Sequence, residues 1–132
     1  MSKEAEDRAT LDALYAEFLA GNLDEWINFW TDESTMWEAD SLPYGGTHKG
    51  RKQIRAAIDV MFEVWSDVDL DVIDTLGSDE RLIMYGNFTG TGRKTGKTIT
   101  FPFAEMWVFK DHKVLEVKPI YGDTVLINSA LG

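Results

Sequence analysis

Apolar side chains recur three or four positions apart through much of the first half of the chain, which is the spacing of one face of an α-helix. This pattern predicts a first helix that ends at Gly21, a short second helix capped by Asn22, and a third helix that begins after Gly50. Their apolar faces comprise Leu11, Leu14, Tyr15, Phe18 and Leu19; then Leu23, Trp26, Ile27 and Trp30; then Ile54, Ile58, Met61 and Trp65. The charged residues 1–7 that precede them are expected to be flexible.

The second half changes to a period of two, which indicates β-strands. Residues 67–72 alternate aspartate with apolar residues, as expected for a strand with one side facing solvent. Further strands are expected at 35–39, at 82–88, at 98–109 and in a last segment that ends near Tyr121. Helices followed by strands joined by short turns predict an α+β fold, with the helices packed on one face of an antiparallel sheet.

The chain is rich in aromatic side chains. The 132 residues include five Trp, seven Phe and four Tyr, and 44% of the chain is hydrophobic. Because each aromatic ring has a large area to bury, these residues either form an unusually bulky core or line a cavity. The length leaves room for one domain with one core, residues 1–132.

Charge and cysteine content narrow the function classes. The net charge of −10 argues against nucleic-acid binding, because contacts to phosphate backbones require basic patches. The chain has no cysteine, so disulfides and thiolate chemistry are excluded. Neither a signal peptide nor a membrane-spanning segment is expected. We therefore predict a cytoplasmic protein with no membrane partner.

Two features of the sequence suggest a phosphate-binding loop and a metal site, but neither has the residue spacing that such a site requires. Residues 92–98 read GRKTGKT and resemble a phosphate-binding loop, but Thr91 stands where that loop requires glycine, and the segment joins two strands. The two histidines, His48 and His112, have no partner at zinc-ligand spacing, so no metal site is predicted. His48 is placed either at the mouth of a pocket or on the surface.

Glu105 is the only ionisable residue on one face of the long strand 98–109. Side chains alternate across a strand, so Phe103 and Trp107 flank it on that face. A carboxyl group between two aromatic rings is poorly solvated, which raises its pKa toward the range of a proton donor at neutral pH. Glu38 shares a strand face with Met36 and Asp40, and the pattern leaves open whether that face is inside.

Three parts of the chain resemble the nuclear transport factor two-like superfamily, and within it the SnoaL-like polyketide cyclases and ketosteroid isomerases. They are LYAEFLAGNLD (14–24) with FWTDESTMWE (29–38), GGTHKGR (45–51), and WVFKDHKV (107–114) with YGD (121–123). The resemblance implies a cone, in which a curved antiparallel or mixed sheet wraps around three N-terminal helices and encloses a pocket open at one end. It also implies a homodimer that pairs through the outer sheet face.

The resemblance also implies roles for individual residues. Glu38 corresponds to a base on the first strand, and Glu105 to a carboxyl group that stays protonated and donates a hydrogen bond to an enolate oxygen. Asp123 lies close to an acid/base aspartate of the cyclases. The residues implied to bind substrate are Tyr15, Trp30, Asp40, Tyr44, His48, Phe62, Phe103, Trp107 and Tyr121. This chain departs from the isomerases in having Leu14 at their helix tyrosine and Glu in place of both Asp residues.

These observations leave three hypotheses for the function. The first is an acid/base enzyme of the isomerase, cyclase or dehydratase (lyase) type, which needs no cofactor and acts on an apolar aromatic or polycyclic carbonyl compound. The second is a non-catalytic module that binds a small molecule or another protein, because one fold hosts many functions. The third is a cone filled by its aromatic residues, with the outer sheet face serving as a dimer or partner surface.

Overall fold

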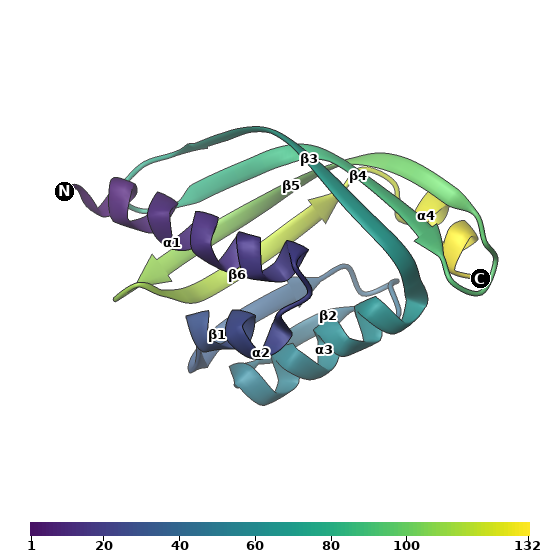
Figure 1. Cartoon of the computed structure of the whole chain (residues 1–132), viewed down its shortest axis with the longest axis horizontal. Coiled ribbons are helices and arrows are strands. Elements are labelled where there is room, and N and C mark those ends of the chain that lie inside the picture. The colour runs from purple at the N-terminus through teal and green to yellow at the C-terminus, as the bar shows by residue number, and fades with distance from the viewer.

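Helices and strands follow one another through residues 1–132 of the computed structural model (Figure 1). The helices are α1 (Lys3–Leu19), α2 (Leu23–Trp26), the 3-10 helix η1 (Ile27–Phe29), α3 (Gly50–Val64) and α4 (Thr124–Leu131). The strands are β1 (Trp30–Glu38), β2 (Gly46–Lys49), β3 (Trp65–Gly77), β4 (Leu82–Gly92), β5 (Thr98–Lys110) and β6 (Lys113–Tyr121). The predicted α+β class is confirmed. None of the helices combines the length and apolarity needed to cross a lipid bilayer.

All six strands form one mixed sheet in the order β2-β1-β6-β5-β4-β3. Neighbouring strands are antiparallel, except that β1 and β6 run parallel. The sheet curls around α1, α2 and α3 without closing, which confirms the predicted cone (Figure 1). Gly86 permits the close approach of β3 to β4, because a Cβ atom there would lie 1.9 Å from the Asp71 carbonyl oxygen. A register shift between Val72 and Asp74 lies beside this glycine and adds to the local bend.

The core fills the space between the concave face of the sheet and the helices. On β5 the predicted alternation is observed, with Phe101, Phe103 and Trp107 buried and Thr98 and Thr100 exposed. The largest fully buried side chains come from separate elements: Leu14, Trp30, Ile54, Trp65, Leu82, Val114 and Ile127. The concave face is therefore an aromatic wall against which the helices pack.

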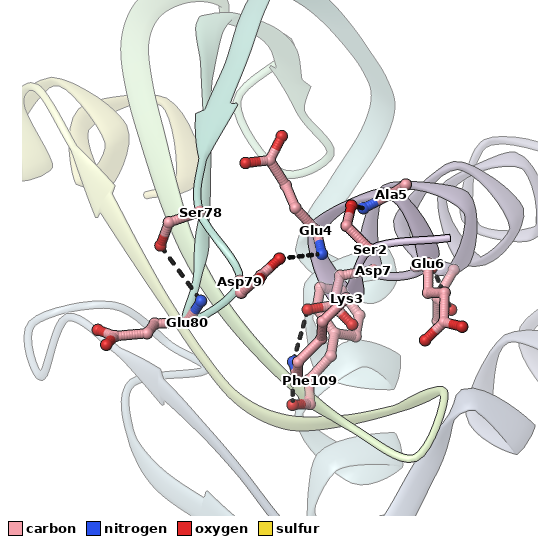
Figure 2. Close-up of polar contacts among 11 residues, drawn as sticks. Ser2, Lys3, Glu4, Ala5, Glu6, Asp7, Ser78, Asp79, Glu80 and Phe109 are labelled. Carbon is pink, nitrogen blue, oxygen red and sulfur yellow. Dashed lines mark hydrogen bonds and ion pairs between the residues drawn. The ribbon is translucent and has the colours of Figure 1, made fainter.

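The start of α1 is anchored to the sheet (Figure 2). Lys3 Nζ lies 2.6 Å from Asp7 Oδ2 and donates a hydrogen bond of 3.1 Å to the carbonyl oxygen of Phe109 at the end of β5. The backbone N–H of Glu4 donates to Asp79 Oδ1 in the β3–β4 turn, at 2.8 Å. Residues 3–7, which were expected to be flexible, form the first turns of α1. These contacts fix the angle at which α1 crosses the sheet.

Three parts of the secondary structure differ from expectation. β1 begins at Trp30, and the polar run 31–34 is an irregular part of the strand in which Ser34 Oγ accepts the Thr31 N–H and donates to the Val114 carbonyl. Residues 46–49, where no strand was predicted, pair with β1 as strand β2. The C-terminal residues 124–131 form α4, which was not predicted. Gly21 ends α1 with φ of 74°, as predicted, whereas Asn22 makes no side-chain capping bond.

Candidate active site

A cavity of about 50 Å³ lies between the concave face of the sheet and α1, α2 and α3. Of its 17 lining residues, 14 are hydrophobic. The lining includes most of the predicted site: Tyr15, Trp30, Glu38, Phe103, Glu105, Trp107 and Tyr121. Because a dry cavity of roughly 150 Å³ is needed to hold benzene, even a one-ring ligand requires some of these aromatic side chains to move aside.

The register of the sheet brings Glu38 and Glu105 level with each other. Met36 on β1 pairs with Val117 on β6, and Glu105 on β5 pairs with Pro119, two residues further along β6. Glu38 lies two residues beyond Met36, so β6 separates the two glutamates within one row. Adjacent strands are about 4.8 Å apart, which places the two Cα atoms roughly 10 Å from each other. Glu38 is 2% exposed, so its strand face, left open by the sequence pattern, is the inner one.

Tyr121 holds the carboxyl group of Glu38. Its hydroxyl donates to both carboxyl oxygens, at 2.8 Å to Oε1 and 3.0 Å to Oε2. Burial raises the pKa of Glu38 to about 8, the Tyr121 hydrogen bond acts in the opposite direction, and the charge of Glu105 adds to the increase. The two acids are therefore close enough to influence each other's ionisation.

Glu105 has no comparable partner. Its Oε1 is shielded from solvent and makes no hydrogen bond, and burial raises the pKa of Glu105 to about 7. The nearby Trp107 N–H lowers that pKa, although Trp107 Nε1 makes no hydrogen bond of normal geometry. With both pKa values raised to the neutral range, the pair retains a proton near pH 7.

The location of that proton depends on which effect dominates. The order of the two pKa values alone places it on Glu38. The hydrogen bonds favour Glu105, because a hydroxyl that donates to both oxygens of Glu38 stabilises the carboxylate form. No donor satisfies Glu105 Oε1, so charge on that group would be uncompensated. This hydrogen-bond geometry assigns the carboxylate to Glu38 and the neutral acid to Glu105.

Unpaired polar atoms concentrate around the cavity. The buried side-chain atoms without a hydrogen-bond partner are Tyr15 Oη, Glu17 Oε2, Trp30 Nε1, Glu105 Oε1 and Trp107 Nε1, and all but Glu17 belong to cavity-lining residues. Buried polar groups in folded proteins are almost always paired. Burial and the charge of Glu105 raise the pKa of Tyr15, which keeps its hydroxyl a neutral donor. The cavity thus presents hydrogen-bonding groups that a polar ligand would satisfy.

The other predicted site residues lie outside the lining. Tyr44 is buried behind Glu38, where its hydroxyl accepts the Trp65 Nε1–H at 3.2 Å. His48 Nε2 lies 2.9 Å from the Tyr44 carbonyl oxygen, and Phe62 packs against Phe18 with ring centroids 5.5 Å apart. The structure does not bring these three residues into contact with the cavity.

The two remaining acids are at the surface. Asp40 is exposed after the end of β1, and Asp123 caps α4 by accepting the Leu126 N–H at 3.0 Å. Neither residue lines the cavity. No group of three His, Asp or Glu side chains is arranged to hold a metal ion. The chemistry-bearing residues of the cavity are thus Glu38, Glu105, Tyr15 and Tyr121.

Sequence reasoning left several lining residues out of the site. Phe18 and Trp26 come from the first two helices, Met61 from α3 and Phe88 from β4. Their apolar stripes were recognised, but a stripe that faces a cavity has the same pattern as one that faces a filled core. Only the packing of the whole cone distinguishes the two.

Comparisons with solved structures find the same fold at low sequence identity. TerC, co-crystallised with polyporic acid, has a TM-score of 0.86 at 19% identity, covering 96% of this chain and 98% of that one. An NTF2-like protein of unknown function from Burkholderia pseudomallei has a TM-score of 0.88 at 21% identity, covering 99% and 98%. A protein from Xanthomonas campestris, provisionally assigned as a polyketide cyclase, has a TM-score of 0.83 at 16% identity, covering 99% and 100%. No curated protein matches this chain.

The family comparison covers all the residues that line the cavity except Pro119 and Tyr121. The SnoaL-like domain matches residues 11–117, from the middle of α1 to the fifth residue of β6. This segment contains both glutamates and the cavity-lining parts of the three N-terminal helices. The resemblance of the sequence to this family is therefore confirmed, and the chain belongs to the SnoaL-like domain family.

Proposed function

We propose that the protein is an acid/base enzyme of the isomerase, cyclase or dehydratase type, which uses no cofactor and acts on an aromatic carbonyl compound. The observation that carries the proposal is the pair of carboxyl groups, Glu38 and Glu105, that face one apolar cavity without a cationic partner. Perturbed carboxyl groups in a cleft are the usual mark of acid/base sites.

The roles follow from the surroundings of each acid. Glu38, aligned by Tyr121, removes a proton from the carbon next to the substrate carbonyl. The C–H electron pair becomes a C=C bond while the C=O π pair moves onto oxygen, which forms an enolate. Glu105, in its neutral form, donates a hydrogen bond to the enolate oxygen. Such a base raises the reaction rate by about 10²- to 10⁴-fold. A hydrogen-bond donor aimed at the developing charge raises the rate by a similar factor. The proton on Glu38 then returns to the same or another carbon.

Tyr15 provides the second donor to the enolate oxygen. Its unpaired hydroxyl lines the cavity close enough to Glu105 for that charge to affect its pKa. The chain thus has a helix tyrosine at the site although Leu14 occupies the position that corresponds to the isomerases' tyrosine. TerC, which shares the fold, was crystallised with polyporic acid. That neighbour supports an oxygenated aromatic ligand for this cavity.

The test is proton exchange on a simple ketone. Wild-type protein is incubated with 2-tetralone in D₂O, and loss of the proton signal next to the carbonyl is followed by NMR. We expect Glu38→Gln to slow the catalysed exchange by about 10²-fold or more. Glu33→Gln, on an exposed position of the same strand, is the matched control and should exchange at the wild-type rate.

Two other results would overturn the proposal. If 2-tetralone binds, as seen by quenching of tryptophan fluorescence, yet exchange is no faster than in buffer, the domain is a binding module. If it neither binds nor exchanges, the aromatic side chains fill the cone. In that case the outer face of the sheet becomes the candidate functional surface.

We also propose that the chain forms a homodimer through the outer face of the sheet. Tyr85 pairs with Ala104, which pairs with Ile120, so the three form a row across β4, β5 and β6. Tyr85 is 37% exposed and Ile120 is 48% exposed. Apolar residues in register on an open sheet face are typical of an association surface.

A further inference from the structure

Two tryptophans at the end of the cavity away from Tyr121 each carry an unpaired indole N–H. Trp30 is 1% exposed and Trp107 is 4% exposed. Both line the cavity, their ring centroids are 6.0 Å apart, and neither Nε1 has a hydrogen-bond partner. An indole N–H can only donate. The cavity therefore contains two indole donors, on neighbouring rings, that make no hydrogen bond of normal geometry within the chain.

Unpaired buried donors destabilise the folded protein unless a ligand accepts their hydrogen bonds. A buried donor without an acceptor destabilises a fold by about 1–3 kcal/mol, and two of them line this cavity. Glu105 is close enough for the Trp107 N–H to lower its pKa, yet neither Trp107 Nε1 nor Glu105 Oε1 makes a hydrogen bond of normal geometry. Phenylalanine would provide aromatic packing at either position without an unpaired N–H. The two N–H groups are thus suited to an oxygen atom brought in by the ligand.

The charge around the cavity limits which oxygen this is. No Lys, Arg or His lines the cavity, whereas two carboxyl groups do. A ligand carboxylate would lie unpaired in an apolar space beside Glu105, which is strongly unfavourable. An uncharged acceptor, such as a ketone or quinone oxygen, satisfies the indoles without this cost.

We propose that Trp30 and Trp107 form a subsite for an uncharged carbonyl or quinone oxygen on the ligand, separate from the carbonyl that faces Glu38 and Glu105. The inference rests on the proposed function because it places the ligand in the same cavity. Trp107 is two residues from Glu105 on one strand face, about 7 Å away. The ligand class is therefore a one- or two-ring compound that carries a second oxygen atom.

The test uses two probes that differ only in the acceptor. 4-Hydroxyacetophenone carries a ketone where 4-isopropylphenol carries a methyl group of similar size. Each is titrated into ¹⁵N-labelled protein, and the indole N–H signals of the five tryptophans are followed. Trp30→Phe and Trp107→Phe assign their own signals. We expect the ketone, and not the isopropyl compound, to move both signals downfield as hydrogen bonds form.

Affinities provide the second readout. We expect Trp107→Phe to lower the affinity for the ketone by about fivefold to tenfold, which is the effect of one neutral hydrogen bond. The affinity for the isopropyl compound should change by less than about twofold. Trp37→Phe is the control, because Trp37 lies on the outer side of β1 between Met36 and Glu38 and does not line the cavity. The signal shifts are measured on wild-type protein, so once the signals are assigned this readout does not depend on how well a variant binds either probe.

Three results would overturn the subsite. They are equal indole shifts with both probes, equal weakening of both probes by Trp107→Phe, and no binding of either probe to the wild type. None of these results decides the acid/base proposal, because proton exchange on 2-tetralone depends on Glu38 and needs no second oxygen. Conversely, a ketone-specific indole shift combined with no proton exchange would retain the subsite and remove the catalysis.

Discussion

Among single residues, the two cavity glutamates link function to stability. Their folded pKa values of about 8 for Glu38 and about 7 for Glu105 lie above the ordinary value of 4.5. The fold therefore favours the protonated forms. This stabilising contribution is complete below pH 4.5 and is lost as the pH rises through 7 and 8. The protein should thus become less stable under mildly alkaline conditions.

Glu105→Gln should remove its share of this pH dependence. A rise of 2.5 pKa units corresponds to about 3 kcal/mol. Between pH 5 and pH 9, the wild-type free energy of unfolding should therefore fall by about 3 kcal/mol more than that of the variant. Urea unfolding at the two pH values measures the difference. Parallel losses in the two proteins would mean that Glu105 is ionised in the fold at low cost, contrary to its role as a neutral donor.

Tyr121→Phe should change the ionisation of the proposed base. The variant loses the hydroxyl that donates to both Glu38 oxygens, which removes the one hydrogen bond that lowers its pKa. We expect the pKa of Glu38 to rise above about 8, and exchange activity at pH 7 to fall by about tenfold with recovery at higher pH. ¹³C NMR titration of the carboxyl groups measures the shift. Tyr85→Phe, on the outer face, is the control, and an unchanged Glu38 titration in Tyr121→Phe would contradict the assignment.

The sequence predicts these residues to different degrees. Alternation on β5 is a local property, and it alone singles out Glu105 between two aromatic neighbours. The orientation of Glu38 depends on pairing between β1 and β6, which joins residues about 80 positions apart, so the local pattern could not determine it. The unpaired state of Trp30 Nε1 and Trp107 Nε1 is also not predictable, because it depends on which acceptors the folded chain leaves out of reach.

At the level of elements, strong local patterns were recognised and weak ones were not. The amphipathic helices and the long strands repeat their signal over many residues. β2 has only four residues and depends on β1 for its hydrogen bonds. α4 contains β-branched Thr124, Val125 and Ile127, which favour strand, and its helical form is stabilised by the Asp123 cap and by burial of Ile127. Tertiary contacts therefore decide these short elements.

The anchoring of α1 gives a prediction for an element. Asp7 is 4% exposed, and Lys3 Nζ is the only group that pairs with its carboxylate. Lys3→Met should lower the free energy of unfolding by about 1 kcal/mol or more, because a buried carboxylate loses its partner. The double variant Lys3→Met with Asp7→Asn should recover part of this loss. Urea unfolding provides the measurement, with Lys110→Met as an exposed control; no loss would mean that α1 is positioned by its apolar face alone.

For the whole molecule, the two sides of the sheet have different properties. The inner side encloses the cavity, and the outer side presents the apolar row of Tyr85, Ala104 and Ile120. The free edge at β3 carries exposed Asp67, Asp69 and Asp71. Acidic residues along an edge oppose strand-to-strand pairing with another copy. Association is therefore expected through the face of the sheet, where the two copies bury apolar side chains, and not through its edge.

This arrangement predicts a substitution that disrupts the dimer without unfolding the monomer. Ile120→Glu places a charge within the proposed interface, where burial would leave it unpaired, so the dimer should dissociate while the monomer stays folded. Val125→Glu is the matched control, since Val125 is 79% exposed on α4, away from the sheet face. Analytical ultracentrifugation should give twice the 14.9 kDa chain mass for the wild type and the control, and a single chain mass for Ile120→Glu. A monomeric wild type at micromolar concentration would contradict the dimer and leave the outer face free for a different partner.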